Sequence, residues 1–179
     1  HPPFRRDHPA GAAAARRRRK LISDGEDQTL SCAPKFQEWK IVAGCLQNVL
    51  VNLGGVDKDN HTLALLQRMA ESSLHPWSVT VVMGNTAPHT DSIRAFAQHA
   101  PFDCRVLVGA NNMAELMAEA DLAIGAAGST SWERCCLGLP TMMLVLAENQ
   151  RSIAETLQQT GVASVADMAD LPVSLASLL

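Results

Sequence analysis

The sequence predicts an α/β domain with an open, doubly wound parallel sheet of the Rossmann-like type. From Val49 onward, short β-rich apolar runs alternate with segments of helical periodicity, which is the pattern of a parallel sheet with crossover helices. Glycine, proline and polar residues separate these runs and mark the turns between the elements. About five or six strands with right-handed crossovers are expected from this pattern.

Each expected strand is followed by a loop of glycine or polar residues. The first strand, 49–53, stops at Gly54 and Gly55, and the helix after it, 59–73, repeats apolar residues at the i, i+3 and i+7 spacing of one helical face. The further strands are expected at 78–83, 105–108, 122–124 and 141–146, and the further helices at 91–99, 113–120, 130–137 and 149–159. After Gly161, the tail is expected to be mostly helical.

Residues 1–47 show no sustained period and are expected to form a linker or irregular N-terminal segment, with one helix near residues 10–20. Residues 48–179 are then the folded domain. The first 20 residues hold seven basic groups and one acidic group, whereas the rest hold eight basic and seventeen acidic groups. A basic cluster can bind nucleic acid. This one is short and alanine-rich and lacks interleaved aromatic residues, so a solvated linker or helix is expected and no nucleic-acid partner.

The composition argues against several classes of protein. No apolar run reaches the roughly 18 residues of a membrane span, and no apolar stretch follows the basic run 16–20 as it would in a signal peptide. The five cysteines are odd in number and lack metal-ligand spacing, which favours reduced thiols in a cytoplasmic protein. No two of the six histidines form a pair at i, i+4, so we expect neither a metal nor a cofactor.

The most informative motif is GAAGSTSWE, residues 125–133, between an expected strand and helix. Gly128 can adopt positive φ without steric cost, and Ser129 is a good N-cap residue. Free amides at the start of a helix bind phosphate, and the hydroxyls of Ser129 and Thr130 add donors. Glu133, one turn further, can accept hydrogen bonds from both ribose hydroxyls. The alternative is an ordinary helix cap, although Trp132 does not fit the N3 position of a capping box.

Three other loops lie at the same expected edge of the sheet, outside the carboxyl ends of the strands, where ligands bind in this fold. After the first strand, Gly54 and Gly55 leave room for a ligand, or form a tight turn in which Asp59 caps the helix. In LAENQ, residues 146–150, Asn149 and Gln150 can donate to and accept from a sugar, or simply form a first helical turn. The loop 108–113 could pair its backbone with the edge of a base.

Residues 108–162, which include GAAGSTSWERCCLGLP and LAENQ, resemble the C-terminal domain of two-domain GT-B proteins. With VNLGGVD upstream, the chain from Val49 onward is most similar to the UDP-2,4-diacetamido-2,4,6-trideoxy-β-L-altropyranose hydrolases of pseudaminic-acid biosynthesis. The lipid II-forming N-acetylglucosaminyltransferases are more distant. The resemblance implies a UDP-sugar as ligand and a separate N-terminal domain as partner, which this sequence does not contain.

The resemblance also implies a role for each candidate residue. Gly128, Ser129 and Thr130 would bind the UDP phosphates, Glu133 would bind the ribose, and Ala110 and Met113 would contact the uracil. Asn149 would lie at the junction of sugar and diphosphate and take part in catalysis. Gly54, Gly55 and Gln150 would lie near the sugar or the diphosphate. The implied reaction is metal-free hydrolysis that releases UDP and a free sugar, with a histidine base in the N-terminal domain. Two alternatives stay open, the donor-binding half of a glycosyltransferase and a stand-alone nucleotide-sugar binding module.

Overall fold

A computed structural model describes residues 46–72 and 78–176. The linker expected over 1–47 lies outside these residues except for its last two positions, as does the helix expected near 10–20. The strands are β1 (Asn48–Asn52), β2 (Ser78–Met83), β3 (Asp103–Val108), β4 (Leu122–Ala126), β5 (Thr141–Leu144) and β6 (Ser164–Ala166). The helices are α2 (His61–Glu71), α3 (Thr90–Ala97), α4 (Met113–Glu119), α5 (Thr130–Cys136), α6 (Arg151–Gln159) and α7 (Leu171–Ala176), with a 3-10 turn, η3 (Glu148–Gln150), before α6.

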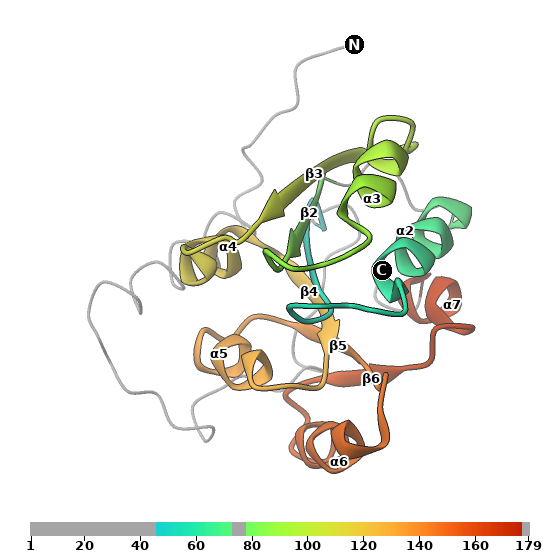
Figure 1. The fold of residues 1–179 in the computed structure, drawn as a ribbon. Coiled ribbons are helices and arrows are strands. Elements are labelled where there is room, and N and C mark those ends of the chain that lie inside the picture. Colours follow the sequence, from blue (N-terminus) through green and yellow to red (C-terminus); the bar gives the residue numbers. More distant parts are fainter. Residues whose placement is uncertain (1–45, 73–77, 177–179) are drawn as a thin grey trace.

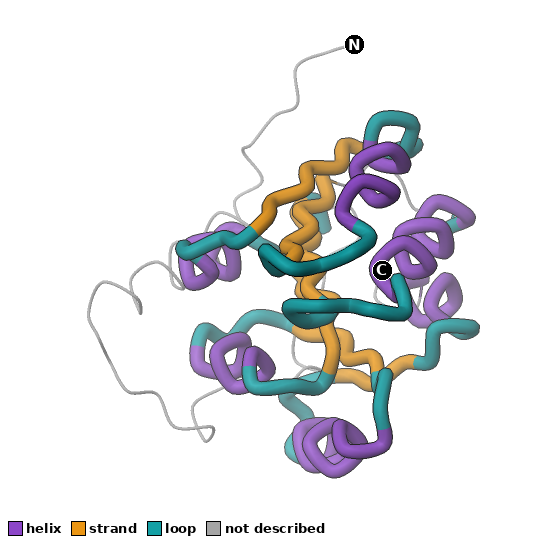
Figure 2. Tube along the Cα trace, in the orientation of Figure 1, coloured by secondary structure: helices purple, strands orange, loops and turns teal. Residues whose placement is uncertain are grey.

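The described strands form one parallel sheet with the order β3-β2-β1-β4-β5-β6. This is the strand order of a doubly wound dinucleotide-binding fold, so the predicted fold class is confirmed. Figures 1 and 2 show the strands running through the middle of the molecule with helices on both sides. The elements expected from the sequence occur in the expected order, with boundaries shifted by up to two residues.

The prediction that the tail is mostly helical was wrong for Ser164–Ala166, which form the edge strand β6 beside β5. Three residues are too few to show a period of two, so the pairing with β5 decides their conformation and not a local pattern. In the part of the tail that the structure describes, Leu171–Ala176 are helical as expected. The strand expected over 141–146 is also shorter, because the chain leaves the sheet after Leu144.

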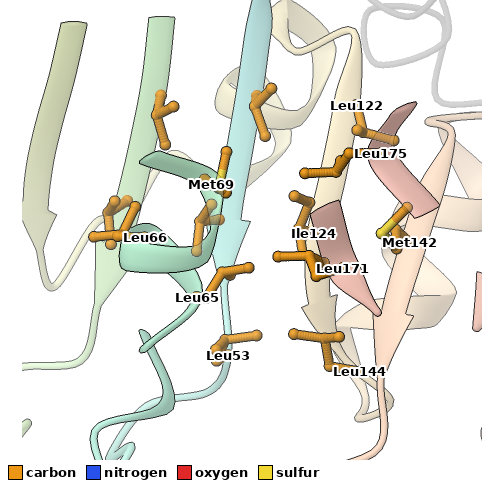
Figure 3. Close-up of a cluster of buried hydrophobic side chains, with 14 of the residues drawn as sticks. Leu53, Leu65, Leu66, Met69, Leu122, Ile124, Met142, Leu144, Leu171 and Leu175 are labelled. Atoms are coloured by element: carbon orange, nitrogen blue, oxygen red, sulfur yellow. The ribbon is translucent and has the colours of Figure 1, made fainter. Parts of the chain in front are cut away.

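Alternating residues of each central strand pack against different helices. On one face, Val49 and Val51 of β1 belong to the same buried cluster as Leu65 and Leu66 of α2. Figure 3 shows leucines of α2 and α7 pointing at β1, β4 and β5 on this face. On the other face, Leu50 of β1 packs with α4 residues, and a further cluster joins β5 to α5 and α6. Thus α2, α3 and α7 cover one face and α4, α5 and α6 the other (Figure 1).

The crossover from one face to the other creates the switch point of this sheet. Strands β1 and β4 are neighbours, with Asn52 paired to Gly125 at their carboxyl ends. From there, the chain after β1 leads to α2 on one face, and the chain after β4 leads to α5 on the other. Ligands of doubly wound folds bind where two adjacent loops diverge in this way. The topology therefore brings the loops 53–60 and 127–129 together at one edge.

Candidate functional site

The loop between β4 and α5 leaves two neighbouring backbone amides unpaired. Within the loop, the amide of Gly128 donates to the carbonyl of Ala126 at 2.9 Å, and those of Ser131 and Trp132 donate to Gly128 and Ser129. The amides of Ser129 and Thr130 have no hydrogen-bond partner among the described residues. Ser129 precedes the helix as predicted, but its hydroxyl makes no capping bond. The ordinary capping alternative therefore does not describe this loop.

Gly128 leaves open space beside these amides. A methyl group placed on its Cα would meet no atom within 4 Å. The positive φ that glycine permits is not used here, because the described glycines with positive φ are Gly54, Gly109, Gly138 and Gly161. The glycine therefore matters for access and not for backbone conformation. A ligand can approach the loop closely at this point.

The loop after β1 is open in the same way, although the start of its helix is already satisfied. A methyl group on Gly54, whose φ is 112°, or on Gly55 would likewise meet no atom within 4 Å. The carboxylate of Asp57 accepts hydrogen bonds from the amides of His61 at 2.8 Å and Thr62 at 2.9 Å. Capping thus occurs at α2, but the capping side chain is Asp57 and not the expected Asp59. The helix start is closed to a ligand, whereas the two glycines before it are open.

The loops after β1 and β2 are tied to each other. The His89 ring nitrogen Nε2 lies 2.9 Å from the carbonyl oxygen of Lys58. A methyl group on Gly84 would collide with the backbone of Gly55, so the two loops touch where each leaves the sheet. His89 consequently supports the position of the glycine loop, through the backbone that follows it.

Glu133 offers a free carboxylate one turn into α5. It is exposed, and it has no hydrogen-bond or ion-pair partner among the described residues. Its neighbour Trp132 is 39% exposed, which is unusual for a large apolar side chain in this domain. An unpaired carboxylate beside the open loop can accept hydrogen bonds from ligand hydroxyls.

The loop after β5 presents one free amide side chain and one that is already in use. The Oε1 atom of Gln150 accepts a hydrogen bond from the Leu146 amide at 3.0 Å and so closes the loop, and the amino group of Gln150 has no partner among the described residues. Asn149 is exposed and has no partner among the described residues. Glu148 pairs with Arg151 at 3.0 Å, and the hydrogen bond to this guanidinium holds the pKa of Glu148 below its usual value.

Met113 begins α4 and Ala110 lies in the loop before it, on the face of the sheet that α5 also covers. Both are partly buried and pack against a cluster that includes Leu116 of α4 and Leu139 after α5. Although they follow β3, which is two strands away from β1, α4 crosses back to contact β1. This return brings them toward the switch point.

Sequence reasoning missed Arg134, which is the largest buried polar side chain next to the loop. It is 1% exposed, and its Nη2 atom donates to the carbonyl of Ala126 and to Oγ of Ser131, each at 2.9 Å. A helical pattern could have revealed it, since Ser131, Arg134 and Cys135 share one face at i, i+3 and i+4 and are all buried. Cys136, the next residue, is exposed, whereas Cys135 is buried.

The ligand-facing candidates therefore come from three adjacent strands, β1, β4 and β5, with Ala110 and Met113 added by α4. Within residues 46–72 and 78–176, no group of three or more metal-ligating side chains is present. The same residues include no helix with the length and apolar character of a membrane span.

Comparison with known proteins identifies the family. The model of the glycosyltransferase family 28 C-terminal domain matches residues 54–179. The spore coat polysaccharide biosynthesis protein SpsG of Bacillus subtilis is 31% identical over 147 residues, which are 79% of this chain and 42% of that protein. The uncharacterized protein MJ1062 of Methanocaldococcus jannaschii is 30% identical over 107 residues, 59% of this chain and 22% of that protein.

Solved structures show the same fold at lower identity. MurG of Acinetobacter baumannii matches with a TM-score of 0.56 and 20% identity, over 84% of this chain and 45% of that one. WaaG, a glycosyltransferase involved in lipopolysaccharide biosynthesis, matches with a TM-score of 0.58 and 19% identity, over 96% of this chain and 42% of that one. The spinosyn rhamnosyltransferase SpnG matches with a TM-score of 0.56 and 19% identity, over 81% and 40% respectively.

In each comparison, the chain spans less than half the length of the relative it matches. The family model covers most of the present chain, including all the candidate loops from Gly54 onward. The chain belongs to the glycosyltransferase family 28 C-terminal domain family.

Proposed function

We propose that this chain binds the UDP part of a nucleotide sugar at the switch point between β1 and β4, as the donor-binding half of an enzyme of polysaccharide biosynthesis. One observation carries the proposal. The unpaired amides of Ser129 and Thr130 lie beside the open Gly128, and the unpaired carboxylate of Glu133 follows one turn later. Amide donors suit a diphosphate, whereas a carboxylate suits a ribose diol.

The roles of the residues follow from what each group can do. Gly128, Ser129 and Thr130 hold the phosphates, and Glu133 accepts from the ribose hydroxyls. The partly buried apolar pair Ala110 and Met113 receives the flat uracil. Gly54 and Gly55 leave space for the diphosphate and sugar on the opposite side of the switch point. Asn149 and the amino group of Gln150 act at the junction of sugar and diphosphate.

Transfer of the sugar to an acceptor is the reaction that the comparisons favour. The family model and two of the similar structures are described as glycosyltransferases or a rhamnosyltransferase, and SpsG is described as a polysaccharide biosynthesis protein. The bond between the sugar and the diphosphate breaks, UDP leaves, and an acceptor hydroxyl forms the new bond. Groups from a second domain are expected to complete the cleft, because each match covers less than half of the relative.

Hydrolysis is the second candidate, with water in place of the acceptor. It is supported by the resemblance of GAAGSTSWERCCLGLP and LAENQ to the UDP-sugar hydrolases of pseudaminic-acid biosynthesis. The free Asn149 is the candidate catalytic residue in that reaction. UDP release from a UDP-sugar, measured with and without acceptor on a protein that contains both domains, separates the reactions. Release that depends on acceptor supports transfer, and equal release without it supports hydrolysis.

Calorimetric titration of the chain with UDP, in the presence of EDTA, tests the binding proposal itself. We expect a dissociation constant on the order of 0.1–1 mM, since a single domain supplies only part of the contacts. ADP is the matched control and should bind more weakly, because a purine is larger than the ring expected against Ala110. A folded sample that binds no UDP at millimolar concentration contradicts the proposal.

A cytoplasmic location stays a prediction that rests on the cysteine content.

A further inference from the structure

Arg134 is a buried cation that links the two ends of the β4–α5 loop. One nitrogen, Nη2, donates both to the carbonyl of Ala126 and to Oγ of Ser131 at 2.9 Å. Ala126 ends β4, and Ser131 is the second residue of α5. The four residues between them are those with the open glycine and the unpaired amides. The hydroxyl of Ser131 also donates to the Ala126 carbonyl, at 3.4 Å, so the guanidinium of Arg134 and this hydroxyl together hold the two ends of the loop from the protein interior.

The sheet makes room for this guanidinium at Gly125. A methyl group on Gly125 would collide with Nη1 of Arg134. The glycine is buried inside β4 and does not adopt positive φ, so neither a turn nor backbone strain accounts for it. The absence of a side chain at Gly125 is explained by the space that Arg134 occupies.

Arg134 forms no ion pair within residues 46–72 and 78–176, and the carboxylate of the neighbouring Glu133 attracts its charge only at longer range. No carboxylate lies within ion-pair distance, and Nε has no hydrogen-bond partner. Burial lowers the pKa of the guanidinium to about 10, so the group is still a cation at neutral pH. Placing a cation in the interior is costly unless a partner compensates it, and an apolar side chain of similar size is often as stable or more stable. The fold alone does not account for the charge.

We propose that Arg134 is a positioning residue for the diphosphate of the bound nucleotide. It holds loop 127–130 in the conformation that presents the Ser129 and Thr130 amides, and its charge, which forms no ion pair, favours an anion on the outer side of that loop. This inference rests on the proposed function, because it requires the diphosphate to bind there. It adds a residue that does not touch the ligand and acts through Ala126 and Ser131.

The test compares the full chain with Arg134→Met, Arg134→Lys and the matched control Ser131→Ala, each titrated with UDP, UMP and uridine by NMR. We expect Arg134→Met to weaken UDP about tenfold or more, as for loss of one charge-assisted interaction. The loss should shrink from UDP through UMP to uridine. Arg134→Lys keeps the charge and should recover part of the UDP affinity. Ser131→Ala keeps the charge and the Ala126 bond, so its loss should be smaller than that of Arg134→Met.

A merely structural role would weaken all three ligands by the same factor, and that result overturns the inference, as does unchanged UDP binding in Arg134→Met. Thermal unfolding checks that each variant is folded. If Arg134→Met does not fold, Arg134→Lys decides, and an equal loss for UDP and uridine in that variant also overturns the inference. A wild-type chain that binds none of the three ligands overturns the proposed function as well, whereas failure of the variants alone overturns only the role of Arg134.

Discussion

Glu133 and Glu148 are both exposed carboxylates near the carboxyl edge of the sheet, and they differ in their partners. Arg151 forms two hydrogen bonds with Glu148, at 3.0 and 3.3 Å, and the resulting pKa shift is downward. A carboxylate stabilised in this way is a weak proton acceptor at neutral pH. Glu133 has no such partner among the described residues, so it is the carboxylate that remains available to a ligand.

Replacing Glu133 by alanine should weaken UDP much more than inorganic pyrophosphate, which has no ribose. A hydrogen bond to a charged group contributes roughly 1.5–3 kcal/mol, which corresponds to about ten- to a hundredfold in affinity. Calorimetry on both ligands measures the difference. Glu119→Ala, at the carboxyl end of α4, is the control and should bind both ligands like the wild type. Equal losses for UDP and pyrophosphate would mean that Glu133 acts through the fold.

Several single residues could be predicted from the sequence, and one was missed. Gly128, Ser129 and Glu133 stand in a motif between a strand and a helix, and their positions follow from the periodicity around them. Arg134 could not be identified from residue type, because arginine is mostly exposed and a charge in a helix normally marks the solvent face. Its burial depends on Gly125, a residue of the preceding strand. Such a pair becomes visible only when the strand and helix are placed together.

The loops between elements divide into those whose amides are already bonded and those whose amides are free. At the start of α2, the carboxylate of Asp57 accepts two amide hydrogen bonds at 2.8 and 2.9 Å. At the start of α5, no side chain takes this role. The loop after β1 therefore contributes open glycines, and the loop after β4 contributes free amide donors.

Asp57→Ala should destabilise the domain by about 1–2 kcal/mol, because the first turn of α2 loses its cap. The φ of 42° at this position adds to the cost, since alanine is less tolerant of the left-handed region than aspartate. Asp59→Ala is the control, because Asp59 has only an exposed contact of 4.0 Å with His61 and should change stability by less than about 0.5 kcal/mol. Urea unfolding of both variants measures this. A larger loss of stability in Asp59→Ala than in Asp57→Ala would identify Asp59 as the capping residue.

Two glycines of the β4–α5 segment should respond to alanine in opposite ways. Gly125→Ala should destabilise the domain by about 1–3 kcal/mol, since the methyl group collides with buried Arg134. Gly128→Ala should change stability by less than about 0.5 kcal/mol, because its methyl group meets nothing, and yet it should weaken UDP by filling the space of the phosphates. Thermal unfolding and UDP titration separate the effects. UDP affinity at the wild-type level in a folded Gly128→Ala variant would exclude close approach of the ligand.

At the level of elements, long periodic segments were easier to predict than short ones. The β2 strand was placed at 78–83 and the helix α4 began at the predicted Met113, because each is bounded by polar or glycine residues. The short β6 strand was missed, since its three residues gain their conformation from pairing with β5. Asn149 and Gln150, two of the three residues of the 3-10 turn η3, were assigned to the helix that follows, because their sequence is compatible with a helix.

The whole molecule is organised around the reversal of strand order between β1 and β4 (Figure 1). This reversal was predictable in kind, because alternating strands and helices favour a doubly wound sheet. It places Gly54, Gly128 and Asn149 on loops after three adjacent strands. The roles of these residues toward a ligand stay predictions, and so does the domain division at residues 47 and 48.

We expect the 179-residue chain, tested by itself, to bind UDP and yet to leave a UDP-sugar intact. Cleavage requires a nucleophile placed against the sugar and a group within hydrogen-bond reach to take its proton. Of the described groups at this edge, Glu148 is paired with Arg151, His89 is engaged with the Lys58 carbonyl, and Glu133 is assigned to the ribose. Asn149 can orient a ligand but cannot accept a proton at neutral pH.

Exclusion of bulk water would also require a second domain to close over these exposed loops, as the length of the relatives suggests. Incubation of the purified chain with UDP-N-acetylglucosamine and a UDP-2,4-diacetamido sugar, followed by chromatography of UDP, measures the outcome. A longer protein that contains both domains is the positive control. UDP release by the short chain at the rate of that control would place the proton acceptor in this half. His89→Ala and Glu148→Ala would then show which of these two groups accepts the proton, and Asn149→Ala would show whether release depends on the orientation that its amide provides.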